Sequence, residues 1–277
     1  MNLSINPNYF INAGVWEENR TIQEALDLVT AAGFTHFDLN TETQEEAEQV
    51  AAYLKEKNLT VIQSHMPFNR YKRGDSQLFH QSVMESAKNA KILDSKILVV
   101  HGDEFNYKER AYTSAAALEY NYRFFYDLVE YAENNGMRVA FENTFQESHL
   151  TAKPHFSSLP DDLFNLVEKY NTKSVGICWD TGHAKLQYGD YDMEVLKLCK
   201  DKLICTHVHD NYYNQDLHGF PFTGIIDWKA LMATLKEIDY QGDFSFELGY
   251  NRLPNALALD FLKLVYRSGE YLLHELK

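Results

Sequence analysis

Short runs of apolar, mostly β-branched residues alternate with amphipathic segments along the whole chain. Continuous apolar runs of this length indicate strands buried on both faces, whereas apolar positions three and four residues apart indicate helices. We predict eight strands, centred near Leu3, Phe37, Ile62, Val99, Val139, Ile177, Thr206 and Phe246. Strand and helix repeat about every 35 residues, which predicts an α/β chain whose parallel βαβ units close into a single (β/α)8 TIM barrel.

Local signals mark where the helices begin and end. Thr21 and Glu24 form a T-x-x-E capping box, and Gly33 supplies the stop eleven or so residues later. Thr43 begins a second helix in the same way. Residues 116–136 are rich in Tyr and Phe, and we expect them to form one continuous fourth helix whose aromatic stripe packs into the core.

Composition narrows the class of protein. A chain of 277 residues with 45% hydrophobic content can build one large core, so we expect a single domain spanning residues 1–277. Cys178, Cys199 and Cys205 show no C-x-x-C spacing and are predicted to be reduced and inert. No signal-peptide pattern and no run of 18 apolar residues is present, so we expect a cytoplasmic protein without a membrane span. The net charge of −14 makes nucleic acid an improbable partner.

Residues that bind metal ions stand at the end of every predicted strand from the third to the eighth. In chain order they are His65, His101, Glu142, Asp180, His207 and Glu247. In a closed parallel barrel the carboxyl ends of the strands surround one mouth, where active sites of this fold lie. A mixture of carboxylate and imidazole suits Zn, Mn or Co better than calcium. The sequence therefore predicts a site for a divalent metal ion at the mouth.

Two local patterns add further candidate ligands. In WDTGHA, Asp180 and His183 stand three residues apart where the sixth strand is expected to give way to a loop. After the seventh strand, Asp216 and His218 form an Asp-x-His pair on a loop rich in glycine and aromatic residues, which could fold over the mouth.

At each position a purely structural role is the alternative to metal binding. A single histidine after a strand, such as His65, is more often a hydrogen-bonded structural residue than a ligand. Glu142 and Glu247 differ, because each ends a strongly apolar strand and would be an uncompensated buried charge without a cation or a basic partner. His207 and His209 lie on the same strand. We expect one of them to face the barrel interior and the other the helices, and assign His207 as the ligand.

With these residues identified, the chain resembles the xylose-isomerase-like barrel superfamily, which contains sugar and sugar-phosphate isomerases and epimerases and also endonuclease IV. The resemblance runs through nearly the whole length, in the motifs SHMPF, VVHGD, FENT, CWDTGHA, THVHDN, GIIDW and FELGY. In the epimerase branch it implies one cation held by Glu142, Asp180, His207 and Glu247. The two glutamates would also be the acid and the base, and His183 would contact a substrate hydroxyl.

Our leading prediction is therefore a metal-dependent isomerase or epimerase that acts on a small carbohydrate by proton transfer next to a carbonyl, through an enediolate. Basic residues gather near the mouth, and we expect Arg70, Arg73 and Arg252 to bind a substrate phosphate. Assembly into a homo-oligomer is compatible with this prediction.

Three alternatives stay open. In the endonuclease IV branch, the resemblance implies that the same four residues join His65, His101, His183, Asp216 and His218 to hold three zinc ions that cleave DNA at abasic sites. The acidic segment DLNTETQEEAE after the second strand weighs against a DNA backbone there. A metal-dependent dehydratase or lyase would use the same two glutamates. A sugar-binding barrel without catalysis is the third alternative, because fold alone does not dictate activity.

Overall fold

Eight parallel strands form one sheet in the computed structural model, which describes residues 1–14, 16–68, 76–102, 113–146, 156–249 and 253–275. The order in the sheet is β7-β6-β5-β4-β3-β2-β1-β8. The strands are β1 (Leu3–Ile5), β2 (His36–Asp38), β3 (Thr60–His65), β4 (Ile97–Val100), β5 (Arg138–Glu142), β6 (Val175–Asp180), β7 (Leu203–His207) and β8 (Phe244–Phe246). All eight predicted strands are present.

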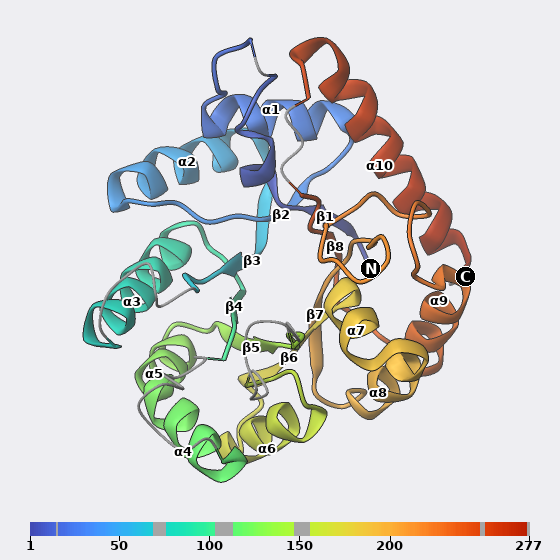
Figure 1. Cartoon of the computed structure of the whole chain (residues 1–277). Coiled ribbons are helices and arrows are strands. Elements are labelled where there is room, and N and C mark those ends of the chain that lie inside the picture. Colours follow the sequence, from blue (N-terminus) through green and yellow to red (C-terminus); the bar gives the residue numbers. More distant parts are fainter. Residues whose placement is uncertain (15, 69–75, 103–112, 147–155, 250–252, 276–277) are drawn as a thin grey trace.

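The two outer strands of this order, β7 and β8, meet and close the sheet into a barrel. Val208 forms a parallel bridge with Phe246. The Val208 amide donates to the Ser245 carbonyl at 2.8 Å, and the Glu247 amide donates to the Val208 carbonyl at 3.1 Å. Figure 1 shows the strands arranged around a common centre with the helices outside them. The predicted (β/α)8 barrel is confirmed.

Helices follow the strands and cover the outside of the barrel (Figure 1). They are η1 (Pro7–Phe10), α1 (Ile22–Ala32), α2 (Gln44–Lys57), α3 (Ser76–Ile92), α4 (Ser114–Phe124), α5 (Tyr126–Asn134), α6 (Pro160–Tyr170), α7 (Thr181–Tyr188), η3 (Gly189–Tyr191), α8 (Asp192–Leu198), α9 (Trp228–Glu237) and α10 (Asn255–Glu275). No described helix combines the length and the apolar character needed to cross a membrane.

The prediction of one continuous helix over residues 116–136 was wrong. The segment is divided at Phe125, whose φ of −96° and ψ of 6° depart from helical values, so that α4 ends and α5 begins there. This bend turns the buried Phe125 ring towards the barrel, where it meets Phe141 of β5 edge-on at 5.4 Å between centroids. The free energy gained by packing Phe125 against the sheet exceeds the cost of interrupting one turn of regular helix.

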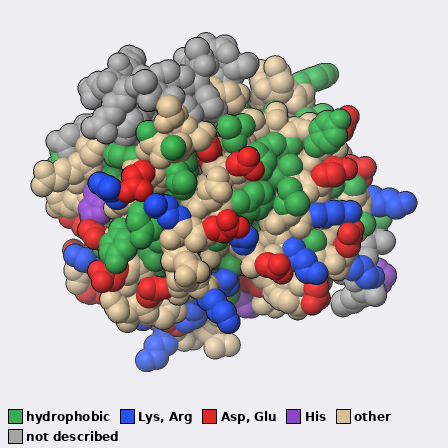
Figure 2. Space-filling model, turned by 90° about the horizontal axis from the view of Figure 1, so that it is seen from below, with side chains coloured by type: hydrophobic (Ala, Val, Ile, Leu, Met, Phe, Trp, Pro, Cys, Tyr) green, Lys and Arg blue, Asp and Glu red, His purple; other side chains and the backbone are tan. Residues whose placement is uncertain are grey.

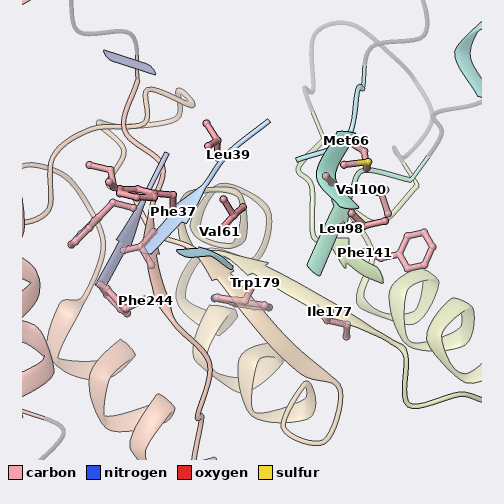
Figure 3. Packing of buried hydrophobic residues seen from close by; sticks show 14 of the residues in the cluster. Phe37, Leu39, Val61, Met66, Leu98, Val100, Phe141, Ile177, Trp179 and Phe244 are labelled. Carbon is pink, nitrogen blue, oxygen red and sulfur yellow. The ribbon is translucent and has the colours of Figure 1, made fainter. Parts of the chain in front are cut away.

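Apolar side chains fill two separate layers. Large ones, including Phe37, Ile177 and Trp179, lie in the layer between the strands and the helices (Figure 3). A smaller cluster contains Ile97, Val99, Ala140, Cys178, Ile204 and Cys205. Alternate residues of a strand share a face. The residue two positions after Ala140, Cys178 or Cys205 therefore lies on the same face of its strand, one step nearer the mouth.

The three cysteines are free and buried, as an inert role requires. Burial raises the pKa of Cys199 to about 12, so this thiol stays protonated at neutral pH.

The capping box at the start of α1 provides a test of the local sequence code. Thr21 Oγ1 accepts from the Glu24 amide at 3.2 Å, and Glu24 Oε2 accepts from the Thr21 amide at 2.7 Å. Thr21→Ala removes the cap and should lower the free energy of unfolding by about 1 kcal/mol, measured by denaturant titration. Thr21→Ser keeps the hydroxyl and should stay near wild type. Equal stability of all three proteins would contradict the role of the cap.

Candidate metal centre

Seven strands contribute a polar side chain from their carboxyl ends, or from the residue directly after, to one connected cluster, and η1 after β1 contributes an eighth. These residues are Tyr9, Asp38, His65, His101, Glu142, Asp180, His207 and Glu247, in strand order. The sequence predicted the six from the third strand onwards. It missed Tyr9 on η1 and Asp38 at the end of β2. Asp38 could have been found by extending the strand-end rule to the second strand.

Glu142 lies at the centre of the cluster, among four imidazoles. Its Oε2 is 3.3 Å from His65 Nε2, 3.3 Å from His101 Nε2 and 3.0 Å from His207 Nδ1, and its Oε1 is 3.2 Å from His183 Nδ1. Despite these distances, neither Glu142 Oε2 nor His207 Nδ1 makes a hydrogen bond with any described residue. Buried polar atoms that lie this close together without a hydrogen bond are expected where a cation would satisfy them.

Glu142, Asp180, His207 and Glu247 form what we call the strand-end group. Each offers one ligand atom, and the four atoms lie within 4.8 Å of one another. All four side chains are buried. The structure thus brings together the four residues expected to hold one ion, and their donor set of three carboxylates and one imidazole fits a divalent cation. Their role as ligands stays a prediction.

Asp38 fixes the orientation of His207. Its Oδ2 lies 3.1 Å from His207 Nε2 and accepts from Gln63 Nε2 at 3.3 Å. With the Nε2 proton donated to Asp38, His207 turns Nδ1 towards Glu142 and Glu247, each 3.0 Å away, where this nitrogen would offer its lone pair to a bound cation. A metal-binding histidine in proteins commonly donates its other ring N–H to a carboxylate in this way.

His65 is oriented by the backbone. Its Nδ1 lies 2.8 Å from the Met66 carbonyl, which can only accept, so Nδ1 carries a proton and Nε2 faces Glu142. His65, Glu142 and His207 also offer three ligand atoms within 4.8 Å of one another. This second set shares two members with the strand-end group.

A third set, which we call the loop group, contains His183, His209, Asp216 and His218. His183 Nδ1 lies 3.1 Å from the Asn143 carbonyl, which leaves Nε2 to face Asp216 Oδ2 at 3.3 Å. His218 repeats the pattern, because its Nδ1 faces the Glu247 carbonyl at 3.1 Å. Its Nε2 then lies 3.2 Å from the same Asp216 oxygen. The predicted Asp-x-His pair does fold over the mouth.

One buried carboxylate holds the loop that carries this pair. Asp210 Oδ2 accepts from the Gly224 amide at 2.9 Å and from Trp228 Nε1 at 3.1 Å, and its Oδ1 accepts from the Ile226 amide at 3.1 Å. A Cβ on Gly224 would lie 2.3 Å from Asp210 Oδ1, so only glycine fits there. The loop is therefore fixed by charge-assisted hydrogen bonds rather than by regular structure.

Two expectations about this region were wrong. His209 does not point away from the site. It is fully buried, and its Nε2 lies 3.0 Å from both carboxylate oxygens of Asp180. Residues two apart on a strand share a face, and this period should have indicated it from the sequence. The chain after Asp180 is also not a loop, because α7 begins at Thr181 with Asp180 as its N-cap, accepting from the His183 amide at 2.6 Å.

Arg70, Arg73 and Arg252, predicted to bind a phosphate, lie outside the described residues.

Charge interactions in the cluster outweigh burial. Burial by itself raises the pKa of Glu142, but His207 and His101 hold that pKa well below its usual range. Burial lowers the pKa of His65, yet the facing carboxylate of Glu142, 3.3 Å away, raises it to about 9. His218 behaves likewise: burial opposes Glu247 and Asp216, and the pKa rises to about 9. Without a cation, Glu142 is ionised and the imidazoles of His65 and His218 hold protons at neutral pH.

The chain belongs to the family described as Xylose isomerase-like TIM barrel, whose model matches residues 26–265. The uncharacterized protein y4fM of Sinorhizobium fredii is 27% identical over 263 residues, which cover 83% of this chain and 82% of that protein.

Solved structures share the fold. A D-tagatose 3-epimerase-like protein superposes over 100% of both chains with a TM-score of 0.77 at 19% identity. L-ribulose 3-epimerase reaches a TM-score of 0.77 at 14% identity, covering 100% of this chain and 96% of its own. The IOLI protein with a bound zinc atom reaches 0.75 at 16% identity, covering 98% and 96%.

The raised imidazole pKa values predict how cation binding depends on pH. A cation that uses the nitrogen of His65, in the second set, or of His218, in the loop group, must displace the proton there. Apparent affinity of these two sets should therefore rise about tenfold per pH unit for each displaced proton. The rise should end near pH 9, where both side chains lose their protons anyway. Competition with a coloured chelator between pH 6.5 and 9.5 measures it.

The stability of the cation-free protein should change in the opposite sense. The folded pKa of His65 exceeds its ordinary value of 6.5, so its proton stabilises the fold below about pH 6.5, and this contribution is lost as pH rises through about 9. A chelator-treated sample that becomes more stable over this range would contradict the assignment.

Proposed function

We propose that this chain is a metal-dependent isomerase or epimerase that moves a proton at a carbon next to the carbonyl of a small polyhydroxylated compound. The observation that carries the proposal is the pair of buried carboxylates, Glu142 and Glu247, whose Oε2 atoms both lie 3.0 Å from His207 Nδ1. Several solved proteins with this fold carry the names of sugar epimerases, which supports the choice of substrate class.

A divalent ion such as Zn, Mn or Co, held by the strand-end group, would supply positive charge next to the substrate carbonyl and lower the barrier to removing the neighbouring proton. Glu247 would then accept the proton on one side of that carbon, and Glu142 would donate one on the other side. Each carboxylate has a pKa well below its usual range, held there by His207 in both cases against the effect of burial. Both are therefore ionised at rest, which suits Glu247 as the acceptor. Glu142 must first take up a proton before it can donate one, and the protonated imidazole of His65, 3.3 Å away, is a source for it.

Tyr9 prepares Glu247 for this role. Its hydroxyl donates to Glu247 Oε1 at 2.6 Å, which leaves Oε2 facing His207. Burial, and next the charge of Glu247, raise the pKa of Tyr9 far above its ordinary value, so the hydroxyl keeps the proton that it donates to Glu247. His183, at the start of α7, is the residue we assign to a substrate hydroxyl.

Solvent exchange tests the proton transfer directly. Ketoses and ketose phosphates, incubated with the protein in deuterated water with manganese, cobalt or zinc, should gain deuterium on a carbon next to the carbonyl. Glu247→Gln should slow the exchange about a hundredfold or more, because the amide cannot accept the proton. Mass spectrometry and NMR of the product measure both effects.

The matched control is Glu237→Gln on the surface of α9, where the carboxylate pairs only with Lys197 in the described contacts. It should leave the rate unchanged. A product that retains every atom of the substrate separates an isomerase from a dehydratase, which would lose water. Turnover without any deuterium uptake would refute the proton-transfer mechanism.

A second candidate function is hydrolysis of a phosphodiester at an abasic site by several zinc ions. The loop group and the set around His65 favour it, because they offer ligands that a single-ion mechanism does not need. The net charge of −14 opposes it. On the face shown in Figure 2, acidic and basic side chains are interspersed, so that face offers no extended basic surface.

Counting bound ions distinguishes the two candidates. We expect about one tightly bound cation per chain by elemental analysis, because one ion suffices for the isomerase mechanism. We also expect no cleavage of an oligonucleotide with a single abasic site, compared with the same oligonucleotide undamaged. Three zinc ions per chain together with nicking at the abasic site would replace the leading proposal by the second one.

A further inference from the structure

We propose that His209 is a positioning residue that connects the strand-end group with the loop group, holding Asp180 through a hydrogen bond and His218 through ring stacking. The inference rests on the proposed metal dependence and deepens it. His209 is not among the nine ligands expected from the sequence, although geometry alone places it in the loop group.

The hydrogen-bonding state of His209 follows from its surroundings. Its Nε2 lies 3.0 Å from both oxygens of Asp180, and its Nδ1 has no hydrogen-bond partner among the described residues. A proton on Nδ1 would be a buried donor without an acceptor, while the Nε2 lone pair would face two carboxylate oxygens. A proton on Nε2 removes both penalties and leaves only an unpaired acceptor. His209 therefore donates to Asp180, and its Nε2 is not available as a ligand.

The ring of His209 also fixes its neighbour in the loop group. The His209 and His218 rings stack with centroids 4.0 Å apart and an interplanar angle of 5°. His218 Nε2 in turn lies 3.2 Å from Asp216 Oδ2. A shift of the His209 plane would therefore move a candidate ligand of the loop group as well as Asp180.

The start of α7 closes the slot that holds His209. Thr181 Oγ1 donates to the His209 carbonyl at 2.8 Å and accepts from the His209 amide at 3.1 Å. At Gly182, an added Cβ would lie 2.0 Å from His209 Cε1. The absence of a side chain at this position lets the imidazole reach Asp180. Thr181 and Gly182 thus hold His209 in one position, although in this proposal His209 itself binds neither substrate nor ion.

Two substitutions of His209 separate its hydrogen bond from its stack. His209→Phe keeps a ring against His218 but removes the donor, and should weaken cation binding by the strand-end group about 10- to 100-fold. His209→Gln carries an N–H close to the place of Nε2 and should recover most of that affinity. Chelator competition gives the affinities, and the visible spectrum of the cobalt-loaded protein reports the geometry around the ion. His274→Phe, exposed on α10, is the matched control and should match wild type.

Gly182→Ala tests the same idea with the imidazole chemically intact. The added methyl group displaces His209, so affinity and cobalt spectrum should change in the direction seen for His209→Phe. Wild-type affinity and an unchanged spectrum in His209→Phe would overturn the proposal. If His209→Phe does not fold, the proposal is tested by the affinity and the cobalt spectrum of Gly182→Ala and by NMR of the wild-type protein.

NMR of nitrogen-labelled histidine in the cation-free wild-type protein provides a test that needs no ion. A proton on His209 Nε2 supports the proposal, and an Nε2 that carries no proton overturns it. A wild-type chain that binds no cation would instead contradict the proposed function, and the NMR result would still decide the role of His209.

Discussion

The mutual compensation of buried charges around Glu142 is the interaction on which the mouth of the barrel depends. A lone buried carboxylate would cost several kcal/mol, and so would a lone buried imidazolium. Four imidazoles surround this one carboxylate within 3.3 Å: two at the ends of β3 and β7, one directly after β4 and one on α7. No two neighbouring strands could provide such a shell, because only closure of the sheet brings so many strand ends to one place. Closure of the barrel therefore offsets the cost of burying Glu142, because it brings the imidazoles to that carboxylate.

The alternation of side chains explains how one sequence builds both the core and the site. Ala140, Cys178 and Cys205 belong to one apolar cluster, and two residues later the same strands carry Glu142, Asp180 and His207. Strands and barrel were predictable because apolar runs of this kind are local signals. The strand-end rule likewise gave six of the polar residues. Tyr9 was not accessible to it, because its place depends on η1, which follows β1 rather than ending it.

Other features depend on tertiary contacts that no local pattern records. The aromatic stripe of residues 116–136 has helical spacing throughout, yet Phe125 leaves the helix because its ring packs on Phe141. The position of His218 depends on the acceptor network of Asp210 and on a left-handed backbone, with φ of 47° at His218 itself. Such a conformation is uncommon outside glycine and costs on the order of 1–3 kcal/mol. A strained residue beside two candidate ligand groups is more consistent with function than with folding.

The two glutamates at the mouth have different surroundings, and this difference bears on the proposed reaction. Glu142 is enclosed by imidazoles on both of its oxygens, whereas Glu247 meets His207 on one oxygen and the Tyr9 hydroxyl on the other. Three of the imidazoles near Glu142 belong to histidines that are themselves candidate ligands outside the strand-end group. An ion bound to these histidines would change the charge around Glu142, whereas Glu247 Oε1 is held by the Tyr9 hydroxyl, which belongs to none of the candidate ligand sets. Glu247 therefore has the environment less sensitive to how many ions are bound, which suits the carboxylate that begins the reaction by accepting a proton.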